Sequence, residues 1–150
     1  MIETEAPLIE IEAPRLRQLY AEWQKWRGDR ELPSRTDFDP VELRYMMGRL
    51  SLVEVHHDPL RFRYRVHGTE IADRLGYDMT GKNLEAWPDD AHRQQIRDYF
   101  GQIVTSRAPR IQHRERMVSH GRILRYCALA LPLSAVGTRV DMLLIGVEFL

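Results

Sequence analysis

The stretch RFRYRVHGTEIADRLG, residues 61–76, contains the strand-to-helix turn on which the interpretation of the fold depends. Apolar and charged side chains alternate through its first seven residues, which predicts a strand with one buried and one exposed face. The buried face is expected to carry Phe62, Tyr64 and Val66. Gly68 then precedes a short helical segment that ends at Gly76.

A strand, a glycine and a helix in this order also begin many phosphate-binding loops. Those loops need several closely spaced glycines, so that the backbone can approach a pyrophosphate at the helix N-terminus. Gly68 has no second glycine beside it, because Gly76 and Gly81 follow too late, and Glu70 would repel phosphate. We therefore interpret Gly68 as part of a turn and not as a nucleotide site.

Residues 14–28 form the first predicted helix, with a proline in its first turn and Gly28 just past its end. The three-and-four spacing places one apolar stripe on it: Leu16, Leu19, Tyr20, Trp23 and Trp26. Because this stripe is too apolar to face water, we expect it to pack on the sheet and to contribute to a homodimer interface. The acidic residues 1–13 before it are expected to be flexible.

A longer helix is predicted over residues 91–106, after a candidate cap at Asp89 or Asp90. Five strand-like segments complete the pattern, at 50–55, 61–67, 110–118, 122–134 and 139–149. Short connections between them favour antiparallel hairpins. The predicted fold is α+β, with a five-stranded antiparallel sheet, internal helices on one face and the N-terminal helix on the other.

The bulk properties narrow the functional classes. The 150 residues fit one domain, here 14–150, and the formal net charge of +0 argues against a general nucleic-acid binder. One cysteine, Cys127, excludes an internal disulfide and fits a reducing cytoplasm. The N-terminus lacks the features of a signal peptide, and no apolar run approaches the ~20 residues of a membrane helix. A cytoplasmic domain without a nucleic-acid or membrane partner is expected.

The chain resembles the PAS domain superfamily, and more closely a bacterial group of stand-alone, single-domain PAS proteins. The similarity runs from about Leu19 to Leu144 and is carried by LYAEW, ELPSRTDFDP, RFRYRVHGTEIADRLG, DMTGK, RYCALALPLS and VDMLL. It implies the strand order 2-1-5-4-3, and a pocket between the helices and the inner sheet face that either holds a small ligand or is packed shut. It implies no catalytic residues in this chain.

The apolar residues expected to face inward in such an arrangement share strand or helix spacing. They predict a pocket lined by Tyr64, Val66, Ile71, Leu75, Ile96, Phe100, Ile103, Cys127 and Leu143. Both faces of the last two strands are apolar, so the direction of Cys127 and Leu143 is left open by the sequence.

The positions of the histidines and of the cysteine were compared with those that metal, haem or flavin binding requires. No close-spaced Cys/His set supports a metal site. His92 is a candidate haem ligand near the start of the long helix, but the neighbouring Asp89, Asp90 and Arg93 predict a solvated position. Cys127 lies in a buried type of strand and lacks the helical motif of flavin-binding photosensors. No cofactor and no metal are expected.

The leading hypothesis is therefore a non-enzymatic sensory or protein-interaction module that signals through a partner protein, with a small ligand in its pocket as a further expectation. The alternative is a haem- or flavin-bearing or enzymatic module that uses the same pocket. The arginines of 61–67 and 110–117 would add a cationic strip, for an acidic partner or anionic ligand, if both strands exposed the same sheet face. A solvated, salt-bridged surface is the other interpretation of these charges.

Overall fold

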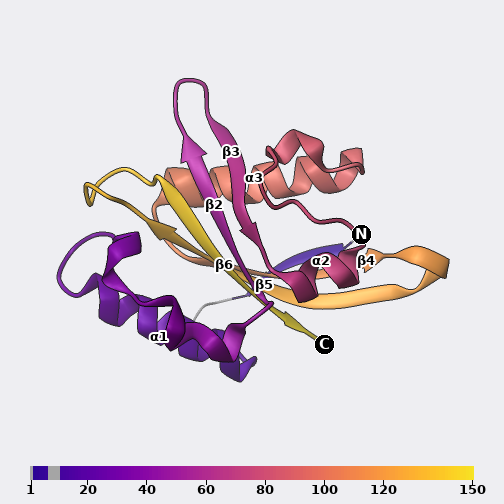
Figure 1. Ribbon diagram of the computed structural model, residues 1–150, viewed down its shortest axis with the longest axis horizontal. Coiled ribbons are helices and arrows are strands. Elements are labelled where there is room, and N and C mark those ends of the chain that lie inside the picture. The colour runs from indigo at the N-terminus through magenta and orange to yellow at the C-terminus, as the bar shows by residue number, and fades with distance from the viewer. Residues whose placement is uncertain (1, 7–10) are drawn as a thin grey trace.

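The computed structural model describes residues 2–6 and 11–150 (Figure 1). Its strands are β1 (Ile2–Ala6), β2 (Leu50–His56), β3 (Arg61–His67), β4 (Arg110–Met117), β5 (Ile123–Leu133) and β6 (Met142–Phe149). Its α-helices are α1 (Pro14–Arg27), α2 (Thr69–Leu75) and α3 (Asp90–Ser106). Short 3₁₀ turns lie at Arg35–Asp37, Pro40–Met46, Leu84–Ala86 and Ser119–Gly121.

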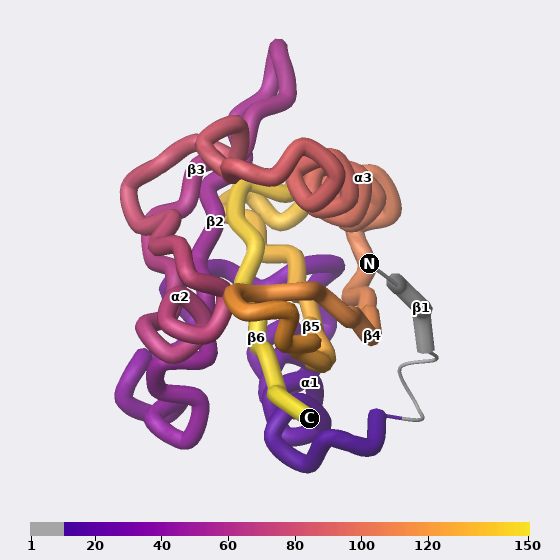
Figure 2. The backbone as a smooth tube through the Cα atoms, turned by 90° about the vertical axis from the view of Figure 1, so that its right-hand side faces the viewer, coloured from indigo at the N-terminus to yellow at the C-terminus, as the bar shows by residue number. Residues whose placement is uncertain are grey.

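The strands form one antiparallel sheet in the order β1-β4-β5-β6-β2-β3. Figure 2 shows β4, β5, β6, β2 and β3 side by side in this order. The five predicted strands are β2 to β6, and their order, 2-1-5-4-3, is confirmed. β1 is an additional edge strand that the sequence analysis did not predict; it pairs with β4 from Ile2 opposite Glu115 to Ala6 opposite Ile111. The flexibility expected for residues 1–13 stays a prediction; the structure describes 2–6 as this strand, while residues 1 and 7–10 lie outside the described residues.

The two faces of the sheet are covered by different helices, with α3 and α1 on opposite sides (Figure 2). On the α3 side, the Tyr99 hydroxyl donates to the backbone oxygen of Ala128 at 3.1 Å. On the α1 side, Gly146 leaves space for the helix, because a Cβ atom there would lie 2.6 Å from Cδ2 of Leu19. The indole of Trp23 donates to the backbone oxygen of Pro132 at 2.9 Å. The apolar character of β5 and β6 at both parities follows from this double coverage.

The apolar stripe of α1 is largely used within the chain itself. Leu16 and Leu19 are 0% exposed and Trp23 is 2% exposed. These three side chains leave no surface for a second subunit, so their expected role in a dimer interface is not supported by the structure. Tyr20 and Trp26 are partly buried, with Trp26 stacked on Phe38 at a ring-centroid distance of 4.3 Å.

A β-bulge changes which side chains of β3 face the core. Leu52 lies opposite Val66 but Val53 lies opposite Tyr64, so Arg65 is an extra residue on the β3 side. A bulge reverses the inward and outward alternation beyond it. Val66 is therefore 43% exposed, and its expected place in the pocket is wrong. His67, expected on the exposed face, points inward and is 5% exposed.

The cationic strip, one of two interpretations of these arginines, does not form, because β3 and β4 are separated by β5, β6 and β2 in the sheet. Arg114 of β4 is also buried, at 5% exposure, on the inner face. The exposed arginines of β3 and the inward arginines of β4 thus occupy different surroundings.

Candidate functional site

A cavity of about 40 Å³ lies between α2, α3, the segment around Trp87 and the inner face of the sheet. About 10–15 Å³ holds one water molecule, so this volume corresponds to roughly three waters. It is well below the ~300–1,000 Å³ of typical pockets for larger ligands. Ten lining residues were not predicted from the sequence: Ser51, His67, Trp87, His92, Tyr99, Arg114, Tyr126, Ala128, Ile145 and Val147.

The structure brings together part of the predicted pocket set. Five of its members line the cavity, namely Tyr64, Ile71, Leu75, Ile96 and Phe100. Ile103 and Leu143 are buried in the core without lining it. Cys127 belongs to the outer face, because its neighbours in β5, Tyr126 and Ala128, point into the cavity. Its sulfur lies 3.0 Å from Nδ1 of His113, and burial raises the pKa of the thiol.

Trp87 is the central side chain of the cavity wall. Residues 81–83 lie along the free edge of β3, where the Tyr64 amide donates to the Lys82 oxygen at 2.9 Å. The short turn that follows, Leu84–Ala86, carries Trp87 over the inner sheet face. Its indole N–H donates to the Tyr64 hydroxyl at 3.3 Å. The segment therefore covers a sheet edge and closes the cavity at the same time.

His67 enters the cavity wall because of the β-bulge. Its Nδ1 accepts a hydrogen bond from the Met79 amide at 3.0 Å, so the neutral ring carries its proton on Nε2. Burial lowers the pKa of His67 to about 4, against a smaller opposing effect of Asp78. The ring is therefore neutral at physiological pH.

His92 lies in the first turn of α3 and is 1% exposed. The expectation that it is solvated is wrong. Its backbone amide donates to the Asp89 cap at 3.1 Å. Its ring turns inward and packs edge-on against Trp87, with the two ring centroids 4.5 Å apart. Neither ring nitrogen has a hydrogen-bond partner among the described residues. Burial lowers the pKa of His92 to about 3, and the charges of Arg116 and Arg114 lower it further.

The β4 and β5 strands supply the other polar side chains at or next to the cavity. The Tyr126 hydroxyl is buried and has no partner among the described residues. Opposite it, Arg114 donates from Nε and Nη2 to Oε1 of Gln112, at 3.1 and 2.6 Å. Arg116, two residues further along β4, lies over the Trp87 ring at 5.7 Å, with a buried Nη1 that lacks a partner in the described part of the chain.

Apolar spacing, which predicts the pocket set, carries no signal for these polar residues. One signal was available: Gln112, Arg114 and Arg116 alternate along β4, and strand parity places all three on one face. Which face that is depends on the pairing with β5, which the sequence does not specify.

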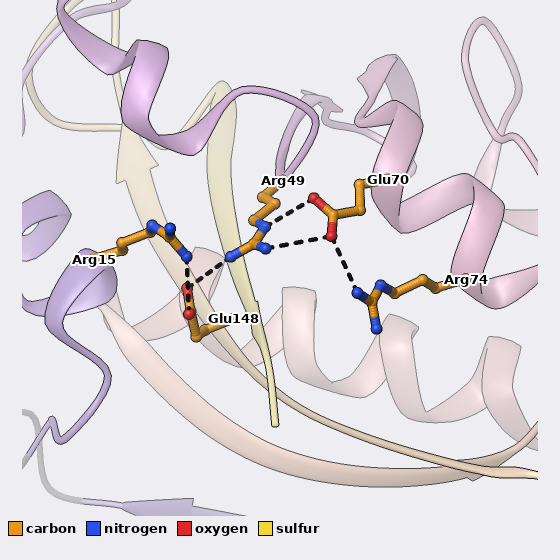
Figure 3. Close-up of polar contacts among 5 residues, drawn as sticks. All are labelled: Arg15, Arg49, Glu70, Arg74 and Glu148. Atoms are coloured by element: carbon orange, nitrogen blue, oxygen red, sulfur yellow. Dashed lines mark hydrogen bonds and ion pairs between the residues drawn. The ribbon is translucent and has the colours of Figure 1, made fainter.

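A chain of ion pairs lies beside the cavity and joins α1, β6 and α2 (Figure 3). Arg49 is its centre, with Nε 2.8 Å from Oε2 of Glu70 and Nη1 3.3 Å from Oε2 of Glu148. Arg15 of α1 also binds Glu148, at 3.1 Å, and Arg74 of α2 binds Glu70, at 3.3 Å. The hydrogen bond and charge of Arg49 lower the pKa of Glu70, although partial burial opposes this.

Within residues 2–6 and 11–150, no three His, Cys, Asp or Glu side chains converge as a metal site would require. The described helices also include none with the length and apolar character needed to cross a lipid bilayer.

Comparison with known proteins identifies the architecture. The family model for the PAS domain matches residues 11–147. The PAS domain of Bordetella pertussis BvgS is similar over 89% of this chain and 87% of that chain, with 14% identity and a TM-score of 0.52. An RNA-binding light-oxygen-voltage receptor is similar over 73% of this chain and 32% of its own, with 14% identity and a TM-score of 0.50. At this identity the two likenesses concern the fold alone. No curated protein is significantly similar.

Proposed function

The chain belongs to the PAS domain family, and we propose that it is a non-enzymatic sensory module whose cavity around Trp87 binds a small ligand. The observation that carries this proposal is the pair of buried, unpartnered polar groups on the cavity wall, His92 and Tyr126. A buried donor or acceptor without a partner costs ~1–3 kcal/mol, and native folds retain few of them. A molecule that completes these hydrogen bonds would explain why this fold retains two at one cavity.

The alternative of a haem- or flavin-bearing module has less support. A cavity of about 40 Å³ does not admit either ring system unless Trp87 and its neighbours move. His92, the candidate haem ligand, is enclosed by the Trp87 ring at 4.5 Å. Cys127, the candidate for flavin chemistry, faces the opposite side of the sheet.

The route of the signal is proposed to run through α2 and the ion pairs around Arg49. Ile71 and Leu75 present one side of α2 to the cavity. Glu70, between them and the surface, is bound by Arg49, which also binds Glu148 and so reaches α1. A ligand that displaces α2 by a fraction of an ångström would change these contacts and the docking of α1.

The receiver of the signal is proposed to be a partner protein, or a second copy of the chain, that contacts the α1 side. Tyr20 and Trp26 are the members of the α1 stripe that remain partly exposed. Aromatic side chains at a surface are frequent anchors of protein interfaces. The buried Leu16, Leu19 and Trp23 would keep α1 attached to the sheet during such contact.

The proposal is tested by screening small polar molecules against the full chain, with the NMR signal of the Trp87 indole N–H as the readout. A matched control is Ala128→Val, since Ala128 lines the cavity and two added methyl groups fill its volume. Hits that shift the Trp87 signal in the wild type, but not in Ala128→Val, support a ligand cavity. A screen in which every hit binds both proteins equally, or none binds, contradicts it.

A further inference from the structure

The polar groups without partners around Trp87 are rich in hydrogen-bond donors. Arg116 offers the buried Nη1, Tyr126 offers its hydroxyl, and His92 offers one N–H when its ring is neutral. We infer that the ligand is a small carboxylate of three or four non-hydrogen atoms, held by Arg116, Tyr126 and His92. This inference rests on the proposed ligand cavity and names the chemical class of its occupant.

The three groups come together through strand register and helix position. Arg114 lies opposite Tyr126 in the β4–β5 pair, so Arg116 is the diagonal neighbour of Tyr126 on the same face. The Trp87 ring lies between α3 and β4: His92 packs on it at 4.5 Å and the Arg116 guanidinium lies over it at 5.7 Å. His92 and Tyr126 line the cavity, whereas Arg116 lies over the Trp87 ring without lining it. A ligand beside Trp87 therefore meets His92 and Tyr126 directly, and its contact with Arg116 requires that side chain to turn toward the cavity.

The charge of the site favours an anion. The guanidinium of Arg116 is partly buried, and burial lowers its pKa; Tyr126 and Asp89 oppose this effect, and Arg114 adds to it. Asp89, which caps α3 by accepting from the His92 amide at 3.1 Å, keeps its negative charge and offsets part of the Arg116 charge. Because Coulomb attraction grows as water is excluded, a carboxylate gains more from Arg116 here than at the surface.

The size of the site limits the anion. A volume of about 40 Å³ equals roughly three waters, which limits the ligand to three or four non-hydrogen atoms. A carboxylate of this size has two oxygens with about four acceptor positions, enough for the three unpartnered donors. Neutral molecules of the same shape leave the guanidinium with Asp89 as its partial counter-charge and add none of their own.

The test compares three probes of similar size at constant ionic strength: acetate, the neutral isostere acetamide, and ethylammonium. The full chain is titrated with each, and NMR shifts of the Trp87 indole and the His92 ring report binding. We expect the Kd of acetate to be at least tenfold lower than that of acetamide, with no binding of ethylammonium. Arg116→Met and Tyr126→Phe should each raise the acetate Kd tenfold or more, and Arg116→Lys should restore part of the affinity.

Tyr45→Phe is the matched control, since the Tyr45 hydroxyl bonds Glu22 outside the cavity and its loss should leave the acetate Kd unchanged. Equal affinity for acetate and acetamide would overturn the carboxylate inference and leave the ligand cavity in place. No shift with any probe would mean that water alone fills the cavity, and would overturn both the inference and the proposed function for ligands of this size.

Discussion

Gly68 and Gly48 approach each other so closely that a Cβ atom on Gly68 would lie 2.4 Å from the Gly48 carbonyl oxygen. The same oxygen accepts hydrogen bonds from the amides of Glu70 and Ile71, at 3.0 and 3.3 Å. The first amides of α2 are therefore bound within the chain and do not face a phosphate. Gly68 serves the close docking of α2 that places Ile71 at the cavity.

Gly68→Ala is expected to lower the free energy of unfolding by at least about 2 kcal/mol, because the added methyl group must displace backbone. Urea denaturation measures the change. Gly101→Ala is the control: Gly101 lies inside α3 with no atom within 4 Å of a built Cβ, so the substitution should stabilise by about 0.5–1 kcal/mol. An unchanged stability of Gly68→Ala would show that the close approach is not required.

Tyr126→Phe is expected to raise the free energy of unfolding of the unliganded protein by about 1 kcal/mol, since it removes a buried hydroxyl that lacks a partner. Tyr99→Phe is expected to lower it by about 1–2 kcal/mol, because the one proton of the Tyr99 hydroxyl is shared between the backbone oxygens of Arg110, at 2.7 Å, and Ala128, at 3.1 Å. Denaturation of the two variants side by side measures this difference in sign. Destabilisation by both would indicate that Tyr126 has a structural partner, such as an ordered water.

Arg49→Met is expected to destabilise the fold by about 1–2 kcal/mol, because it leaves Glu70 and Glu148 without their shared, partly buried cation. Arg74→Met removes a more exposed pair with Glu70 and should change stability by less than about 0.5 kcal/mol. Hydrogen exchange should show faster exchange in α1 and α2 for Arg49→Met. Equal effects of the two variants would argue against Arg49 as the link between these helices.

Stability is expected to fall between pH 6.5 and pH 4 through the two buried histidines. The pKa of His67 is lowered from 6.5 to about 4 and that of His92 from 6.5 to about 3, so in this range the unfolded chain binds more protons than the folded chain. Each histidine should lower the free energy of unfolding by about 1–2 kcal/mol at pH 5, relative to its value at pH 8. Denaturation across this range measures the slope, and His92→Phe should reduce it by about half. A stability that stays constant from pH 8 to pH 5 would contradict the buried, neutral state of these rings.

The antiparallel hairpins and the double coverage of the sheet could be predicted from the sequence pattern, because short connections favour hairpins and β5 and β6 are apolar at both parities. The strand order followed from the resemblance to the PAS superfamily and not from the pattern. The direction of individual side chains could not be predicted. The alternation in RFRYRVH continues without interruption, so nothing in it indicates the bulge at Arg65 that exposes Val66 and buries His67. The prediction that His92 is solvated was wrong for a related reason. Charged neighbours indicate that a helix turn lies near the surface, but they do not indicate the direction in which one side chain of that turn points. The side chains that line the cavity could therefore be identified only from their packing in the folded chain.

The native mass spectrum of the full chain, purified under mild conditions, tests most directly whether the cavity holds a ligand. We expect a one-to-one adduct of a small molecule in the wild type that is absent in Ala128→Val, whose added methyl groups occupy the cavity. A wild-type spectrum that shows the unmodified chain alone, and stays so after incubation with the small polar molecules of the screen, would contradict the account.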